Sequence, residues 1–301
     1  MHYVLVGGTA TGKKVLSAEL HRRHGWPVLS MDSMKVYRGM DIGTDKPTPE
    51  LRDEIPFELL DLVGHDEGFN AGLWVEHAKQ SVKKAEGSVL FAGGTPLYLR
   101  LLVDGMVQGP RKDDVIRGEL EALWDEEGEA SVRGQLAAVD PEMEQRLLPG
   151  DRKRVIRSLE VYRLTGRPFS RLQDSETVQP IPGEFRIVAL RREQKTHDRR
   201  IEERVERMFK EGLVGEVETL QGIAPFASEP GRAIGYLEGR SLLTGEMSEA
   251  EAVQRVAQRT RRLVRKQHTF LRSFKAVQWV DIGPDDATES MIPQVEGAFA
   301  V

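Results

Sequence analysis

The chain has 301 residues, 39% hydrophobic and 30% charged, which fits a soluble globular protein with a hydrophobic core. It contains no cysteine, so a disulfide framework and thiolate metal sites are excluded, and no apolar run approaches the roughly eighteen residues that a membrane span needs. The formal net charge of −5 argues against indiscriminate binding to nucleic acid.

The N-terminal residues lack the basic start and cleavage site of a signal peptide, and their apolar run leads directly into a glycine-rich loop. We therefore expect a cytoplasmic protein.

Short apolar runs alternate with helical patterns along most of the chain. The runs predict strands at residues 2–6, 27–30, 88–92, 185–190 and 276–280. The first helical pattern covers residues 14–24. Strands that alternate with helices in this way indicate an α/β fold with a parallel sheet covered on both faces.

The middle of the chain has a different pattern. Residues 112–175 predict helices only, at 115–125, 129–138, 141–147 and 152–164. We therefore expect an α/β core formed by residues 1–111 and 176–301, with its C-terminal helices, and an all-helical insertion domain at 112–175.

Two long helices are predicted near the end, at residues 202–220 and 249–274. In the second, Val256, Leu263 and Phe270 recur every seven residues and are expected to face the core.

Basic residues are concentrated in two stretches. Residues 254–275 carry eight Lys or Arg and no acid, and residues 152–167 carry six Lys or Arg with Glu160 as the only acid. Such stretches indicate either solvated helix faces or local binding of an anionic partner.

A glycine-rich loop follows the first strand and opens the first helix. It reads Gly7, Gly8, Thr9, Ala10, Thr11, Gly12, Lys13, Lys14, which is the Walker A spacing in its required context. Glycines let backbone N–H groups converge on a phosphate, the helix N-terminus adds a favourable dipole, and Lys13 adds a positive charge. The sequence therefore predicts a phosphate-binding loop.

Residue 14 departs from that pattern, because Lys14 stands where Ser or Thr normally contacts Mg²⁺. An ammonium has no lone pair for a metal. Three alternatives follow: Mg²⁺ is held by diphosphate oxygens and water, the Lys14 ammonium partly replaces the charge of the metal, or the site is degraded. No protein residue is predicted as a metal ligand.

Strand-end residues point to the chemistry. P-loop ATPases usually place a carboxylate at the end of a second strand, but the strand at 88–92 runs into Gly93, Gly94 and Thr95. Asp32 follows the strand at 27–30 instead. Because carboxyl ends of parallel strands share one edge, Asp32 is expected near the phosphate loop, where it could accept a proton from a nucleophile.

The segment that begins at Asp32, together with motifs further along the chain, resembles the tRNA dimethylallyltransferases, also called tRNA isopentenyltransferases. The resemblance extends from about residue 3 to 275 and rests on motifs that occur in the family's order. They lie at residues 32–47, 93–98, 151–162, 165–168, 233–236 and 260–267. Six motifs in sequence are far more specific than any one of them.

The resemblance implies a P-loop kinase-like core with a helical insertion domain that contacts the tRNA anticodon stem-loop. The implied reaction moves dimethylallyl from its diphosphate to N6 of the adenine next to the anticodon (position 37), and it releases diphosphate. The implied partners are tRNA and dimethylallyl diphosphate, with Mg²⁺ as the implied cofactor and no membrane. A monomer is expected.

The same resemblance implies residue roles. Asp32 would be the general base, Thr95 would position the base and the reacting centre, and Arg117 would reach the reaction centre from the insertion. Residues 7–14 and Arg200 would bind the diphosphate. The residues implied to contact tRNA are Asp32, Ser33, Met34, Lys35, Lys153, Arg154, Val155, Ile156, Arg157, Arg232, Ala233, Ile234, Gly235 and Tyr236.

Three alternatives to this function stay open. The first is a non-catalytic RNA-binding relative, which Lys14 suggests. The second is a small-molecule kinase, which the phosphate loop alone also fits. A prenyltransferase of free adenine nucleotides is the third. Tyr37 and Tyr236 could stack on bases or belong to the core.

Overall fold

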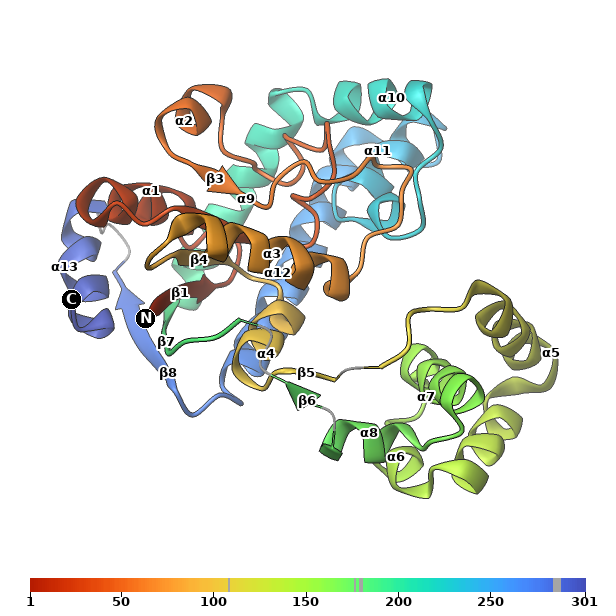
Figure 1. Ribbon diagram of the computed structural model, residues 1–301. Helices are drawn as coiled ribbons and strands as arrows, with labels where there is room; N and C mark the ends of the chain where they lie inside the picture. Colours follow the sequence, from red (N-terminus) through yellow and green to blue (C-terminus); the bar gives the residue numbers. More distant parts are fainter. Residues whose placement is uncertain (108, 176, 179–180, 284–287) are drawn as a thin grey trace. The chain divides into compact units, whose positions relative to one another are not determined.

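A six-stranded, all-parallel sheet forms the centre of the larger of two compact units (Figure 1). The computed structural model describes residues 1–107, 109–175, 177–178, 181–283 and 288–301. In spatial order the strands are β3 (Phe57–Glu58), β2 (Val28–Met31), β4 (Leu90–Gly93), β1 (His2–Gly7), β7 (Phe185–Arg192) and β8 (Val277–Ile282). The five predicted strands and the parallel α/β class are confirmed, whereas β3 was not predicted.

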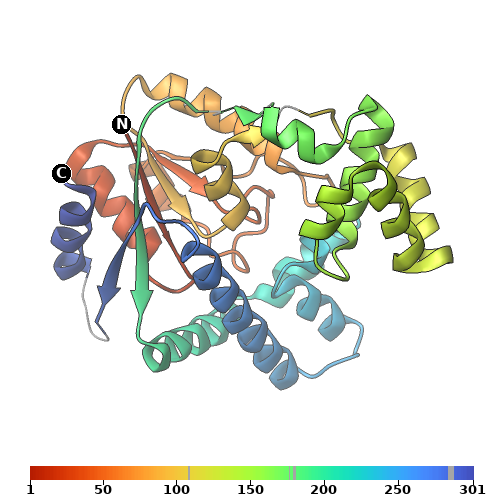
Figure 2. The same ribbon diagram turned by 90° about the horizontal axis from the view of Figure 1, so that it is seen from below.

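Helices cover both faces of the sheet, as Figures 1 and 2 show. On one face, α1 (Lys13–His24) and α13 (Thr288–Phe299) pack on side chains such as Leu5 and Leu90. On the other face, Trp74 of α3 (Ala71–Ala85) packs on Phe91, with ring centroids 6.2 Å apart. Successive strand residues point to opposite faces, so Leu90 and Phe91 serve different layers and both are buried.

The larger unit contains further helices. They are α2 (Pro49–Glu54), α4 (Pro96–Val103), which continues into the smaller unit, α9 (Gln194–Lys210), α10 (Leu213–Ile223), the 3-10 turn η1 (Pro230–Arg232), α11 (Tyr236–Leu243) and α12 (Glu249–Leu271). The single predicted helix at 202–220 is wrong: Gly212, with φ of 102°, separates α9 from α10. A left-handed residue of this kind ends one helix and suits glycine.

The buried side of α12 also differs from the prediction. Leu263 is 38% exposed, whereas Thr260, Val264 and Gln267 are buried. Positions seven residues apart drift around a straight helix of 3.6 residues per turn. Of the three residues predicted to face the core, only Val256 is therefore fully buried.

The smaller unit, Leu101–Pro180, has its own hydrophobic core. Its elements are β5 (Met106–Val107), α5 (Asp114–Val139), α6 (Pro141–Arg146), α7 (Arg152–Thr165), α8 (Phe169–Ser175) and β6 (Thr177–Val178), and β5 pairs antiparallel with β6. Gly128, with φ of 82°, interrupts α5 between the two helices predicted there. The predicted domain boundary at residue 176 lies outside the described residues.

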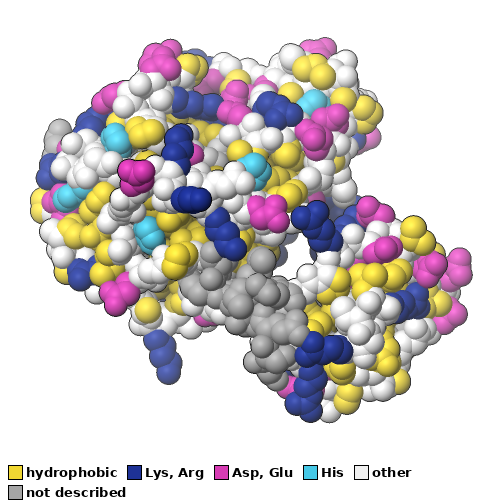
Figure 3. Space-filling view, in the orientation of Figure 1, with side chains coloured by type: hydrophobic (Ala, Val, Ile, Leu, Met, Phe, Trp, Pro, Cys, Tyr) yellow, Lys and Arg dark blue, Asp and Glu magenta, His cyan; other side chains and the backbone are white. Residues whose placement is uncertain are grey.

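Charge is mixed on the face that Figure 3 presents, where Lys and Arg side chains of the larger unit are interspersed with Asp and Glu. Among the described residues, no helix is long and apolar enough to cross a membrane.

Gly93 generates a prediction about the sheet. A Cβ at this position would meet the backbone oxygen of Met31 at 2.3 Å, so Gly93→Ala should force β2 and β4 apart. We expect it to lower the free energy of unfolding by about 1–3 kcal/mol or more, measured by urea unfolding.

The matched control is Gly215→Ala in α10, where an added Cβ meets nothing within 4 Å and which should be neutral or stabilise by up to about 1 kcal/mol. Equal stability of the two variants would show that β2 and β4 tolerate separation.

Candidate functional site

Three strand ends meet at one edge of the sheet. Gly93 lies beside Val6 of β1 and beside Met31 of β2 in the two parallel ladders. The residues that follow these strands are the phosphate loop, Asp32 and the Gly94–Thr95 turn. The predicted convergence of Asp32 with the phosphate loop is therefore a consequence of β4 lying between β1 and β2.

The phosphate loop curls back on its lysine. Lys13 Nζ donates to Gly7 O at 2.8 Å, to Gly8 O at 2.7 Å and to Thr11 Oγ1 at 3.3 Å. Gly12, with φ of 100°, immediately precedes α1. The loop thus has the predicted strand–loop–helix context, and its lysine lies over the loop itself.

Helix α9 holds the loop from outside. His197 Nε2 lies 2.7 Å from Thr9 O, and Arg200 Nε donates to Ala10 O at 3.2 Å. Burial lowers the pKa of His197, which favours a neutral ring that donates one N–H. Arg200 therefore lies at the phosphate loop, and His197 is a supporting residue that the sequence interpretation missed.

Asp32 and Thr95 lie on adjacent turns. Asp32 Oδ1 accepts the N–H of Met34 at 2.9 Å, which leaves Oδ2 without a hydrogen-bond partner among the described residues. Thr95 Oγ1 accepts the N–H of Ser33 at 3.0 Å and lies 3.4 Å from Ser33 Oγ. The two side chains are thus joined through Ser33, with one carboxylate oxygen available to accept a proton.

A cleft of about 860 Å³ opens at this edge of the sheet. All of its walls belong to the larger unit. Among the side chains that line it are Lys13, Lys14, Asp32, Lys35, Asp45, Arg200 and Arg204. Its volume suits a small molecule, and the lysine and arginine side chains in its lining suit an anionic one.

Asp45 is the centre of the charges in the cleft, and the sequence interpretation did not single it out. Its Oδ1 accepts from Lys14 Nζ at 2.7 Å and its Oδ2 from Arg204 at 2.9 Å, while Lys35 Nζ donates to its backbone oxygen at 2.9 Å. Burial alone would raise the pKa of Asp45, but Arg204, Lys14 and Lys35 together hold it below its usual value.

Two lysines of the cleft have depressed basicity. Burial, followed by the charge of Lys35, lowers the pKa of Lys13 to about 7. Burial also lowers the pKa of Lys35 to about 8, against the opposing effects of Asp32 and Asp45. A bound anion would reverse both shifts, so the cleft is suited to one.

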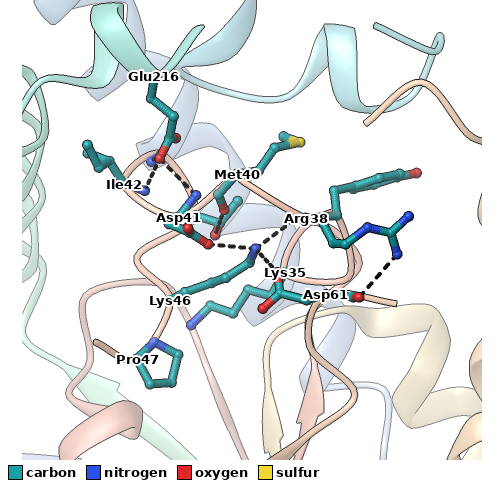
Figure 4. A network of polar contacts seen from close by, with 12 residues as sticks. Lys35, Arg38, Met40, Asp41, Ile42, Lys46, Pro47, Asp61 and Glu216 are labelled. Carbon is teal, nitrogen blue, oxygen red and sulfur yellow. Dashed lines mark hydrogen bonds and ion pairs between the residues drawn. The ribbon is translucent and has the colours of Figure 1, made fainter. Parts of the chain in front are cut away.

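The segment that carries Asp45 is clamped on two sides (Figure 4). Glu216 of α10 accepts the backbone N–H groups of Asp41 at 2.9 Å, Ile42 at 2.7 Å and Gly43 at 3.3 Å. The buried Lys46 ammonium donates to Tyr37 O at 2.6 Å and lies 2.8 Å from Asp41 Oδ1. Glu216 and Lys46 therefore fix the path of the chain on either side of Asp45.

The predicted tRNA-contact residues of the larger unit divide by exposure. Arg232 is exposed, whereas Tyr236 is fully buried and its hydroxyl donates to Glu216 Oε1 at 2.6 Å. Tyr37 is also buried. Both tyrosines belong to the core in this structure, so of the two alternatives for them packing is favoured over base stacking.

In the smaller unit, a buried carboxylate joins two of the predicted arginines. Glu160 Oε2 accepts from Arg117 and from Arg157, each at 2.7 Å, while its Oε1 accepts the N–H of Asp113 at 2.9 Å. Burial opposes the charge of Glu160, yet the bonds from Arg157 and Arg117 hold its pKa below the usual value. Glu160 was seen in the sequence only as the one acid in a basic stretch.

The basic start of α7 also divides by exposure. Lys153 and Arg154 are exposed, whereas Val155 and Ile156 are buried in the core of the smaller unit. The side chains of Val155 and Ile156 therefore pack in this core, while Lys153 and Arg154 are the exposed members of the implied contact set in this turn.

Comparisons with known proteins agree with the predicted fold class. A family model described as "IPP transferase" matches residues 35–274, and one described as "Isopentenyl transferase" matches residues 1–63. The chain is 41% identical to the tRNA dimethylallyltransferase of Geobacter metallireducens over 282 residues, which cover 92% of this chain and 91% of that protein. It is 40% identical to tRNA dimethylallyltransferase 2 of Geotalea uraniireducens over 290 residues, which cover 95% and 93%.

Solved structures are similar over most of the chain. The tRNA isopentenylpyrophosphate transferase of Bacillus halodurans matches with a TM-score of 0.70 and 31% identity, covering 99% of this chain and 96% of that one. A eukaryotic dimethylallyltransferase acting on tRNA matches with a TM-score of 0.80 over 93% of this chain and 73% of that one. At 23% identity, this second likeness concerns the fold alone.

The lowered lysine pKa values predict proton uptake on anion binding. Sulfate has no group that titrates near neutral pH, and when bound in the cleft it should raise the pKa of Lys13. Because the pKa of Lys13 in the free protein is about 7, sulfate binding at about pH 7 should be accompanied by uptake of about half a proton by Lys13. The affinity for sulfate should fall as the pH rises above that value. Calorimetry in two buffers of different ionisation heat measures this uptake.

Lys13→Met should remove most of the uptake, whereas Lys79→Met on the exposed side of α3 should leave it unchanged. Binding heats that do not depend on the buffer would show that Lys13 is fully charged before sulfate arrives.

Proposed function

The chain belongs to the IPP transferase family, and we propose that it transfers dimethylallyl from dimethylallyl diphosphate to N6 of the adenine at position 37 in tRNA. One observation carries the proposal at the level of residues. The carboxylate of Asp32, whose Oδ2 is available to accept a proton, lies at the same sheet edge as the phosphate loop and lines the same cleft.

The donor would lie with its diphosphate against the phosphate loop. As the C–O bond of the donor breaks, negative charge grows on the departing diphosphate. Three sources of positive charge at the loop would stabilise that charge: the backbone N–H groups of the loop, the Lys13 ammonium and the Arg200 guanidinium. This stabilisation favours loss of the leaving group over return to the donor.

The acceptor amine would approach from the Asp32 side. The N6 nitrogen forms the new C–N bond and loses one proton to the Asp32 carboxylate, from which the proton passes to solvent. Thr95, linked to Ser33 and so to the Asp32 turn, would orient the adenine and the carboxylate. Adenines in loops are already poorly stacked, so their entry into a cleft costs less than extrusion from a duplex.

Both units would supply RNA contacts, Lys153 and Arg154 from the smaller unit and Arg232 from the larger one. We propose that Lys153, Arg154 and Arg232 hold backbone phosphates, which sets affinity and register but not base choice. We propose that Arg117, oriented by Glu160, acts toward the reaction centre.

A protein-held Mg²⁺ does not fit the donor set of the cleft. Lys14 offers no oxygen, and both Asp45 oxygens accept from cationic side chains. Asp32 by itself offers one free oxygen, and the described residues contain no group of three His, Cys, Asp or Glu suited to a metal. We propose that any Mg²⁺ in the reaction arrives on the diphosphate oxygens. We also propose a cytoplasmic monomer.

The kinase and binding-only alternatives receive no support from the comparisons, since the curated relatives reported above are named as tRNA dimethylallyltransferases.

Transfer in a single turnover tests the proposed base. Asp32→Asn keeps the size of the side chain but removes its capacity to accept a proton, so transfer from labelled dimethylallyl diphosphate to an anticodon stem-loop should slow by about 100-fold or more. Stem-loop binding should change little.

Asp53→Asn, an exposed residue of α2, is the matched control and should retain the wild-type rate. If wild type labels the adenine and Asp32→Asn labels it equally fast, another group removes the proton. If wild type transfers nothing, the proposed function is wrong.

Salt dependence tests the RNA contacts of α7. The double change Lys153→Ala with Arg154→Ala should weaken stem-loop binding and make the slope of log affinity against log salt shallower by about one to two. Lys79→Ala with Lys83→Ala on α3 removes the same charge elsewhere and should leave the slope unchanged. Equal slopes in both double variants would exclude phosphate contacts at the start of α7.

A further inference from the structure

Residue 14 of the phosphate loop carries an amine that the structure anchors. Lys14 Nζ donates to Asp45 Oδ1 at 2.7 Å, and the two side chains are 28% and 26% exposed. A lysine on an open surface moves freely, and it loses considerable side-chain entropy when a ligand immobilises it. Here a second chain segment, thirty-one residues away, holds the ammonium at the cleft.

Asp45 anchors more than one cation. Its second oxygen accepts from Arg204 of α9, whose side chain is 15% exposed, at 2.9 Å. Because an ammonium and a guanidinium each have several N–H donors, one bond apiece to Asp45 leaves further donors on both groups for a ligand. Asp45 therefore orients Lys14 and Arg204 without exhausting them.

The position of Asp45 is itself enforced. Its φ is 54°, a left-handed conformation that is uncommon for residues other than glycine. The Glu216 and Lys46 clamps on the preceding and following residues hold this conformation in place. A degraded site would not require such constraint on a single carboxylate.

Cations outnumber carboxylates around the loop. Four cations interact electrostatically with one another and with two carboxylates, Asp32 and Asp45; the cations are Lys13, Lys14, Lys35 and Arg204. Burial and the neighbouring positive charges lower the pKa values of Lys13 and Lys35. A diphosphate would neutralise this surplus directly. The hydroxyl of Thr11 in the loop donates to Gly8 O at 2.8 Å and accepts from Lys13 Nζ at 3.3 Å, so Lys13 already engages the oxygen of this hydroxyl.

We propose that Lys14 and Arg204, anchored together by Asp45, take the place of a divalent cation, so that this chain binds the diphosphate group without a metal. The inference rests on the proposed function, since it concerns the donor site of that reaction. On this proposal, Lys14 replaces the hydroxyl that would contact Mg²⁺ with a positive charge that contacts the diphosphate directly.

Calorimetric titration with inorganic diphosphate, in Mg²⁺ buffer and in EDTA buffer, tests it without any transfer step. Wild type should bind with affinities within about threefold of each other in the two buffers. Lys14→Met should lose about tenfold or more in EDTA, since it removes a charge-assisted hydrogen bond. Lys14→Thr should be equally weak in EDTA and should recover when Mg²⁺ is added.

Lys79→Met is the matched control and should behave as wild type, and thermal unfolding of each variant establishes that it is folded. The inference is overturned if wild type binds more than about tenfold more weakly in EDTA than in Mg²⁺, or if folded Lys14→Met binds as wild type does in EDTA. Metal-independent binding together with failed transfer to the stem-loop would uphold the inference and reject the proposed reaction. Absence of diphosphate binding in both buffers would reject the inference and the assigned donor site together.

Discussion

The pairing of β4 with both β1 and β2 is the constraint on which the site depends. Parallel strands in register deliver their carboxyl ends to one edge, and Gly93 is the last residue of β4, paired with Val6 of β1 and with Met31 of β2. A side chain there would collide with the Met31 backbone, so close approach of the strands requires glycine. The phosphate loop, Asp32 and Thr95 are near one another because of this contact and not because of any direct bond among all three.

Much of this arrangement could be predicted from the sequence because its signals are local. A strand, a glycine-rich loop and a helix in immediate succession specify the phosphate loop, and an aspartate after a strand specifies its edge. The helix boundaries near Gly212 and the buried side of α12 were harder to predict from the sequence. They depend on the conformation of one residue and on which neighbours the helix meets, and neither is encoded in a simple repeat.

Asp45 could not be predicted for a related reason. Its partners, Lys14 and Arg204, lie far from it along the chain, and nothing in the spacing of these residues brings them together. Their contact follows from the fold of residues 41–46, which in turn depends on Glu216 in α10 and on the buried Lys46. The same holds for Tyr236, for which the sequence left base stacking and core packing both open and whose hydroxyl completes the Glu216 clamp.

The two units use their acidic residues in the same way. Glu160 holds Arg117 and Arg157 in the smaller unit, and Asp45 holds Lys14 and Arg204 in the larger one. Each carboxylate is charged because its cations are close, and each cation is oriented because the carboxylate is fixed. A chain with a net charge of −5 can therefore present directed positive groups to phosphates, since part of its acid is committed to holding basic side chains in place. Net charge describes the long-range field, while the anchored pairs decide where an anion binds.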